Sequence, residues 1–147
     1  MPIFLIIRIK RNNKKTADDL AKINTGFSVG GSVILISDNA YEKLGKPKTI
    51  RKVKLSLAGY IKTEYDYLGK CKVQVLTDDK ISGAVEAYML YRPGKQYSLI
   101  SDELTDRFGI QILAPGEGLW RFKDDPPDKV RTTVFKPKGK FEDLLKE

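Results

Sequence analysis

The sequence predicts an all-β fold with one or two short helices, and three features of its pattern lead to this expectation. Short runs of apolar or alternating residues, which are typical of β-strands, follow one another along the 147 residues. Turn-forming pairs such as Asn12-Asn13 and Pro126-Pro127 separate them. Only two segments, residues 36–45 and 100–109, carry the capping residues of short helices. A chain of this length suits one domain.

The expected strands run through most of the chain. Residues 32–36 are apolar almost throughout, which indicates a strand buried on both faces. Residues 61–68 and 70–76 look like the two arms of an antiparallel pair. The other strands are expected at residues 3–11, 20–23, 49–57, 84–91 and 131–135. The expected core consists of Ile7, Ile9, Ile23, Val33, Leu35, Leu44, Val73, Val75, Leu99, Leu104, Phe108 and Ile112.

The two helical segments resemble each other. One reads ISDNAYEKLG and the other ISDELTDRFG, and each has a serine N-cap (Ser37 and Ser101), an acid in its first turn and a glycine at its end. This internal echo is explained either by the capping residues that short helices commonly share or by a duplication of one strand-helix unit. A further helical turn is expected in the terminal segment 141–147.

The composition excludes several kinds of active site. The chain has no histidine, so Ser-His and Cys-His nucleophile pairs are absent. We therefore treat the Gly-x-Ser-x-Gly match at residues 26–30 as accidental. The single cysteine, Cys71, alternates with lysines and is expected to be a buried structural thiol. We expect neither a metal nor another cofactor.

The charge and the apolar runs bear on partners and location. The longest apolar runs are too short to cross a bilayer and no secretory signal is visible, so we expect a cytoplasmic protein without a membrane partner. A net charge of +8, concentrated at residues 8–15, 43–54 and after Arg121, admits nucleic-acid binding. A lysine-rich surface that keeps the chain soluble is the preferred interpretation, so nucleic acid is not an expected partner. The alternative is a basic β-rich nucleic-acid-binding module with tyrosines as stacking surfaces, namely Tyr60, Tyr65 or Tyr67.

The order of four segments resembles the retropepsin-like aspartic proteases. These segments read INTGF, VILISDNAYEKLG, AGYIKTEYDY and YSLISDELTDRFGIQI. In that family an apolar strand delivers Asp-Thr-Gly, a glycine-tipped flap follows, and a late strand enters a helix that ends in glycine. The resemblance implies an acid-protease closed barrel over residues 1–123, with residues 124–147 as a C-terminal extension of unknown role.

The resemblance also assigns a site. Asn24 stands where the family carries its catalytic aspartate, while Thr25 and Gly26 match the family triplet. Thr25 would tie two such loops together through its hydroxyl, and Gly26 would let the backbone approach the site closely. The substrate-binding residues implied are Ile23, Phe27, Leu99 and the flap residues Ala58, Gly59, Tyr60 and Ile61.

Only one such triplet is present, so the resemblance implies a homodimer in which one loop from each subunit meets at a two-fold axis. The implied reaction is hydrolysis of a peptide or protein substrate by a shared carboxylate pair. A carboxamide has no proton to lose, so this sequence is predicted to be inactive. Three interpretations stay open: an engineered inactive protease, a natural peptide-binding pseudoprotease, or a turn residue that merely resembles the triplet.

Overall fold

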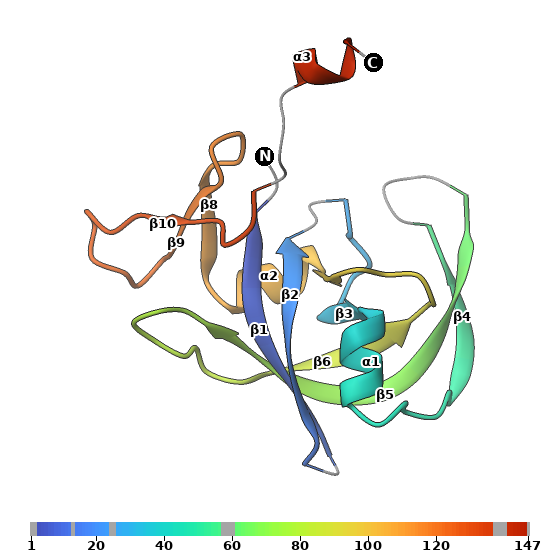
Figure 1. The fold of residues 1–147 in the computed structure, drawn as a ribbon. Helices are drawn as coiled ribbons and strands as arrows, with labels where there is room; N and C mark the ends of the chain where they lie inside the picture. The colour runs from blue at the N-terminus through green and yellow to red at the C-terminus, as the bar shows by residue number, and fades with distance from the viewer. Residues whose placement is uncertain (1–2, 13, 24–25, 57–60, 137–140, 147) are drawn as a thin grey trace.

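The computed structural model describes residues 3–12, 14–23, 26–56, 61–136 and 141–146 (Figure 1). Strands dominate it, as the sequence predicts, and the helices are short. The elements are β1 (Phe4–Arg11), β2 (Thr16–Ile23), β3 (Val33–Ile36), α1 (Asp38–Lys43), β4 (Arg51–Leu55), β5 (Thr63–Leu76), β6 (Val85–Tyr91), β7 (Ser98–Ile100), α2 (Asp102–Arg107), β8 (Ile110–Ala114), β9 (Leu119–Phe122), β10 (Arg131–Thr132) and α3 (Phe141–Leu144).

Six strands close into a barrel. Hydrogen-bonded neighbours follow the order β1-β2-β7-β3-β6-β5, and β5 pairs back with β1. The β2–β7 and β3–β6 pairs are parallel, whereas the other pairs of the barrel are antiparallel. Closure gives every barrel strand a partner on each side, which satisfies backbone groups that an open sheet would expose at its edges. The all-β closed barrel with short helices is therefore confirmed.

The prediction of two arms at residues 61–76 was wrong, because β5 is one strand of 14 residues. Its first part pairs with β4, and its second part pairs with β1. The register with β6 shifts between Tyr67 and Gly69, and Gly69 has a φ of +102°. This bulge, rather than a turn, explains the glycine in the middle of the segment. In Figure 1 the ribbon of β4 and β5 rises beside the barrel.

Alternate residues of the barrel strands fill its interior. Ile7 and Ile9 of β1, like Val73 and Val75 of β5, are fully buried. Cys71 lies among them, and burial raises the pKa of its thiol to about 12, which agrees with a structural role. All the expected core residues are buried except Ile112, which is 37% exposed. Its inclusion was wrong because β8 lies at the edge of a separate small sheet.

The predicted serine caps of the two helices are confirmed. Ser37 Oγ accepts a hydrogen bond from the Ala40 N–H at 3.0 Å, and Ser101 Oγ accepts one from the Leu104 N–H at 3.3 Å. The glycines beyond the helices adopt left-handed backbone, with φ of +83° at Gly45 and +71° at Gly109.

The internal echo corresponds to a repeated structural unit. In each copy a short strand leads directly into a capped helix, β3 into α1 and β7 into α2. The two strands pair antiparallel with each other, with Leu35 opposite Leu99. Each also runs parallel to another strand of the barrel, β3 to β6 and β7 to β2. This arrangement, in which both copies make the same kinds of strand pairing, favours duplication over capping residues that unrelated short helices share.

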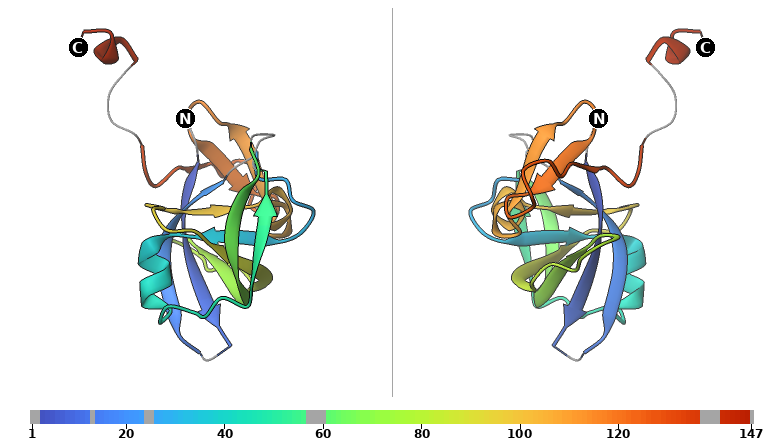
Figure 2. Two further views of the ribbon diagram at one scale, coloured as in Figure 1. Left: turned by 90° about the vertical axis from the view of Figure 1, so that its right-hand side faces the viewer. Right: turned by 90° about the vertical axis from the view of Figure 1, so that its left-hand side faces the viewer.

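The chain after α2 forms a second, three-stranded sheet in the order β10-β9-β8. Figure 2 shows it at the end of the barrel opposite the β1–β2 turn. The strand expected at residues 131–135 is limited to Arg131–Thr132, and it pairs with β9 across the expected domain boundary at residue 123. The Phe4 N–H donates to Thr133 Oγ1 at 2.8 Å, which ties this segment to β1. The expected terminal helical turn is present as α3. None of the helices in the described ranges is long and apolar enough to cross a bilayer.

Candidate functional site

A second apolar cluster lies outside the barrel interior, on the other face of β3, β6 and β7. Ile34 and Ile36 of β3 point into the barrel, so the alternation of the strand sends Val33 and Leu35 to the outer face. These two residues, together with Phe27, Tyr65, Leu90 and Leu99, form what we call the outer cluster. Burial on both faces explains why β3 is continuously apolar, as the sequence predicted.

The chain that follows β2 covers the outer cluster. Phe27 is fully buried in it, and Val29 packs against it. The Phe27 carbonyl accepts a hydrogen bond at 3.1 Å from the backbone N–H of Asp102, in the first turn of α2. Burial, with a smaller contribution from Asp106, raises the pKa of Asp102. The loop that begins at Gly26 is thus fixed to the helix of the second repeat.

Ser101 strengthens the link between this loop and α2. Its hydroxyl donates to the Gly31 carbonyl at 2.9 Å, and its oxygen accepts from the Val33 N–H at 3.0 Å. Ser101 is also the N-cap of α2 and is fully buried. Ser101 therefore does more than cap a helix: it positions the loop that leads into β3.

An apolar groove of about 370 Å³ opens beside this loop. It lies between the loop and the ribbon of β4 and β5, and its floor comes from β3 and β6. Gly30 and Gly31 line it without side chains, and Arg51 adds a charged side chain to its wall. The apolar side chains that line it are Val29, Val33, Val53, Leu55, Tyr67, Tyr88 and Leu90. We refer to this feature as the apolar groove.

The residues predicted to form the peptide site fall into three groups. Gly26 and Phe27 begin the loop that borders the apolar groove, and Leu99 joins Phe27 in the outer cluster. Ile23 instead points into the barrel core, where it is 6% exposed, and Ile61 is 88% exposed and does not line the groove. The other predicted residues, Asn24, Thr25, Ala58, Gly59 and Tyr60, lie outside the described residues.

Sequence reasoning missed a buried carboxylate at Asp19. The side chain of Asp19 accepts hydrogen bonds from Ser37 Oγ at 2.7 Å, Ser98 Oγ at 2.6 Å and Asn39 Nδ2 at 3.3 Å. Asp19 thereby joins β2 to the start of α1 and the start of β7. The signal for it was the alternation of β2, which places Asp19 on the inward side with Ala17 and Ala21.

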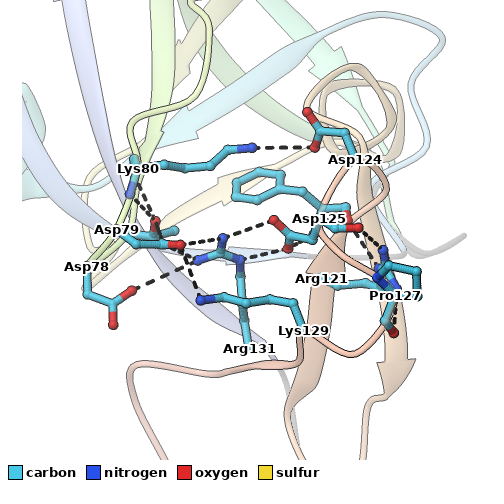
Figure 3. Close-up of polar contacts among 11 residues, drawn as sticks. Asp78, Asp79, Lys80, Arg121, Asp124, Asp125, Pro127, Lys129 and Arg131 are labelled. Carbon is cyan, nitrogen blue, oxygen red and sulfur yellow. Dashed lines mark hydrogen bonds and ion pairs between the residues drawn. The ribbon is translucent and has the colours of Figure 1, made fainter.

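Sequence reasoning also missed an ion cluster around Arg131 (Figure 3). The Arg131 guanidinium donates to both carboxylate oxygens of Asp125, at 2.9 and 3.0 Å. It also donates to both oxygens of Asp79, at 2.6 and 3.2 Å. These contacts lower the pKa of both carboxyl groups and raise the pKa of Arg131. Because Asp79 lies between β5 and β6, the cluster fastens the small sheet to the barrel.

The polar clusters differ from a metal centre or a catalytic constellation. Their donors and acceptors satisfy one another, which is typical of structural networks. No group of three metal-ligating side chains occurs within the described part of the chain. No protein-family model, curated protein or solved structure matches the sequence or the fold. The function is therefore argued from the apolar groove and from the loop that borders it.

Proposed function

We propose that this chain is a retropepsin-like protein that binds extended peptides in a cleft shared by a homodimer, and that Asn24 prevents it from cleaving them. The observation that carries the proposal is the apolar groove beside the loop that begins at Gly26. The Asn24-Thr25-Gly26 triplet directly follows β2 in the sequence. The segment that contains the expected flap connects β4 to β5, and both of these strands line the groove.

The shape and chemistry of the groove suit an extended peptide. Val53 and Leu55 alternate along β4 with lysines that face away from the groove, so β4 presents these two apolar side chains, next to Arg51, to the groove. An extended peptide sends alternate side chains to one side, and apolar side chains would fill the groove while polar ones remained in water. Gly30 and Gly31 leave room for the backbone of a ligand to approach the loop.

A homodimer is part of the proposal because a single triplet provides only half of a shared site. The small sheet offers a contact for a second copy, since β8 has β9 as its neighbour on one side and none on the other among the described strands. Leu113 on this edge is 47% exposed, and an apolar edge strand is a template for pairing with another chain.

Asn24 determines the chemistry that the proposed dimer can perform. In the retropepsin-like mechanism one carboxylate accepts a proton from the attacking water while the other, protonated, donates to the developing oxyanion. Two asparagines can hydrogen-bond a water molecule and a peptide, but they can neither accept that proton nor share one. The chain as sequenced is therefore proposed to bind peptides without hydrolysing them, and the domain is proposed to span residues 1–123 with an extension of unknown role.

Peptide binding can be tested by changing one wall of the groove. We expect Leu55→Gln to weaken the binding of an apolar extended peptide by about tenfold, because a half-buried leucine contributes on the order of 1–2 kcal/mol when it is covered. Titration of a fluorescent peptide library followed by anisotropy measures the affinity. Lys54→Gln is the matched control, since its side chain is on the other side of the same strand. Equal affinities for both variants and the unmodified chain would place the peptide site elsewhere.

A further inference from the structure

The fold brings two basic segments that are distant in the sequence to one end of the barrel. The β1–β2 hairpin and the end of α1 lie side by side there, opposite the small sheet (Figures 1 and 2). We call this surface the basic end and define it by Lys10, Arg11, Lys14, Lys15, Lys43 and Lys46.

Two contacts hold the basic end together. Arg11 Nη1 donates a hydrogen bond to the Leu44 carbonyl at 2.7 Å, at the C-terminal end of α1. The side chain of Lys15 crosses Gly45 so closely that a Cβ added to that glycine would lie 2.6 Å from Lys15 Nζ. The hairpin is therefore fixed against the helix, and the positive charges of the two segments are held near one another instead of being spread over the surface.

The backbone at the basic end is unusual in a way that involves lysine. Lys14 and Lys46 have φ of +70° and +52°, and they are the non-glycine residues with positive φ among those described. A residue with a Cβ is disfavoured in this conformation by roughly 1–2 kcal/mol, and glycine or asparagine normally occupies it. Two lysines in two separate strained turns of one surface point to a use for their charge.

Lys10 and Lys46 of the basic end are exposed. Lys46 approaches Glu42 at 3.7 Å, and both side chains are exposed, which makes this pair weak. Lys10 lies directly opposite Lys72 in the β1–β5 pairing, so two like charges face each other across neighbouring strands. Glu86 lies opposite Lys72 in the β5–β6 pairing and offsets part of this repulsion, and an anionic partner would relieve more of it.

We propose that the basic end binds the phosphate backbone of double-stranded nucleic acid. A duplex is favoured over a single strand because Tyr41 of α1 stacks on Tyr91 with a centroid distance of 3.9 Å, which occupies one face of its ring and makes it less available to stack on a base. It is favoured over a bilayer because, among the residues that the structure describes, no exposed large apolar side chain belongs to the hairpin or to α1. A projecting two-stranded ribbon also matches the width of the major groove of a duplex.

This proposal is independent of the peptide groove, which is lined by β3 to β6 and by the loop after β2. The binding would be insensitive to sequence, because lysines that contact phosphates position a protein without reading bases. Its affinity should fall steeply as the salt concentration rises, since each neutralised phosphate releases a counterion.

A triple variant tests the proposal. Lys10→Gln, Lys14→Gln and Lys43→Gln combined should weaken binding to a fluorescein-labelled duplex of about 20 base pairs at least about tenfold at about 100 mM salt. The slope of log K against log salt concentration should become shallower by about 2 to 3, close to one unit per lysine. Arg11 and Lys15 are left unchanged because they hold the hairpin to α1.

Two controls make the outcome decisive. Lys54→Gln, Lys123→Gln and Lys136→Gln combined remove the same net charge from exposed positions elsewhere and should leave the slope unchanged. The corresponding triple Lys→Arg variant of the basic end should retain duplex binding. Equal losses in both glutamine variants, tighter binding to a single strand of the same length, or binding only to phosphatidylserine vesicles would each overturn the proposal. Unaltered melting temperatures verify that the variants are folded.

Discussion

Asp19 carries a carboxylate that the fold buries to 7% exposure beside three polar partners. The two serine hydroxyls that donate to it belong to Ser37 and Ser98, one from each copy of the strand-helix repeat. The Ser37 N–H also donates to Ser98 Oγ at 3.1 Å, which closes the network. Both copies of the repeat therefore contact Asp19, and the stability of the barrel should depend on this carboxylate.

We expect Asp19→Asn to lower the free energy of unfolding by about 2 kcal/mol. All three partners donate to the carboxylate, so an NH₂ group in place of either oxygen faces another donor, at Asn39 or at the two serines. A buried polar group without a partner costs about 1–3 kcal/mol. Urea denaturation followed by circular dichroism measures the change. Asp18→Asn is the control, because Asp18 forms an exposed pair with Arg8 that should contribute less than about 1 kcal/mol. Similar losses in both variants would mean that the buried network adds nothing.

Single residues were predictable where local pattern determines them. The serine caps follow from the residues around each helix start, and the burial of Cys71 follows from its alternation with lysines. Asp19 was missed, although its inward register was visible, because its partners lie far along the chain. The exposure of Ile112 could not be foreseen, because it depends on which strands cover β8.

At the scale of elements, the small sheet depends on Arg131 for its attachment to the barrel. The Arg131 side chain is 6% exposed, and it binds the carboxylates of Asp79 and Asp125 in a bidentate manner. The Asp125 side chain is 4% exposed. Asp125 Oδ2 additionally accepts from the Phe122 N–H at 2.8 Å, so the same carboxylate holds the turn after β9. Removing the cation would leave the nearly buried Asp125 carboxylate without the guanidinium that pairs with it, so its negative charge would be compensated much less.

We expect Arg131→Met to destabilise the protein by about 3 kcal/mol or more at neutral pH, the usual result of removing one partner from a buried pair. The lowered pKa values of Asp79 and Asp125 determine the pH dependence. A carboxyl whose pKa is lower in the folded state stabilises fully above its unfolded pKa of about 3.9, and this contribution is lost as the pH falls through the folded value. The difference in unfolding free energy between the two proteins should therefore shrink between about pH 5 and pH 2.

Thermal and urea unfolding at several pH values tests this expectation. Lys52→Met is the control, because Lys52 pairs with Asp66 at an exposed position and should change stability little at any pH. A difference for Arg131→Met that stays constant on acidification would show that lost packing, rather than the carboxylates, explains the destabilisation.

Elements were predicted well where hydrogen bonding is local and poorly where distant strands intervene. The glycine in β5 signalled an interruption, but the sequence did not distinguish a bulge from a turn, because the bulge exists only through the register with β6. Likewise, the short β10 is limited to the residues that reach β9, although RTTVF has a strand-like composition throughout.

At the scale of the whole molecule, neither the closure of the barrel nor its parallel pairs can be read from local pattern. The β2–β7 and β3–β6 pairs join segments that are far apart along the chain, and they create the outer cluster and the groove together. The sequence alone indicated Phe27 and Leu99 as neighbours of one site, through the family resemblance. Val53, Leu55 and Tyr67 were missed, because their shared face appears only when the β4–β5 ribbon folds over β3 and β6.

The last prediction joins the triplet to the proposed dimer. Asn24→Asp should create endopeptidase activity on the acidic side of neutral, within about pH 3 to 7, because two carboxyls at one axis repel each other and one retains its proton. General acid-base chemistry commonly contributes ~10² to 10⁴ in rate, so the contrast with the Asn24 chain should be large. Cleavage of an unfolded protein by both forms, followed by mass spectrometry, measures it.

A site built from two copies makes this activity depend on protein concentration. The specific activity of the Asn24→Asp protein should rise with concentration and level off when sedimentation equilibrium shows a complete dimer. Adding Leu113→Glu at the exposed edge of β8 should shift both curves to higher concentration together, because it places like charges opposite each other across the proposed contact. Leu145→Glu, at a leucine of the terminal segment that is 71% exposed, should shift neither. A folded Asn24→Asp dimer that cuts nothing would leave peptide binding as the function of the groove, and activity independent of concentration would contradict the shared site.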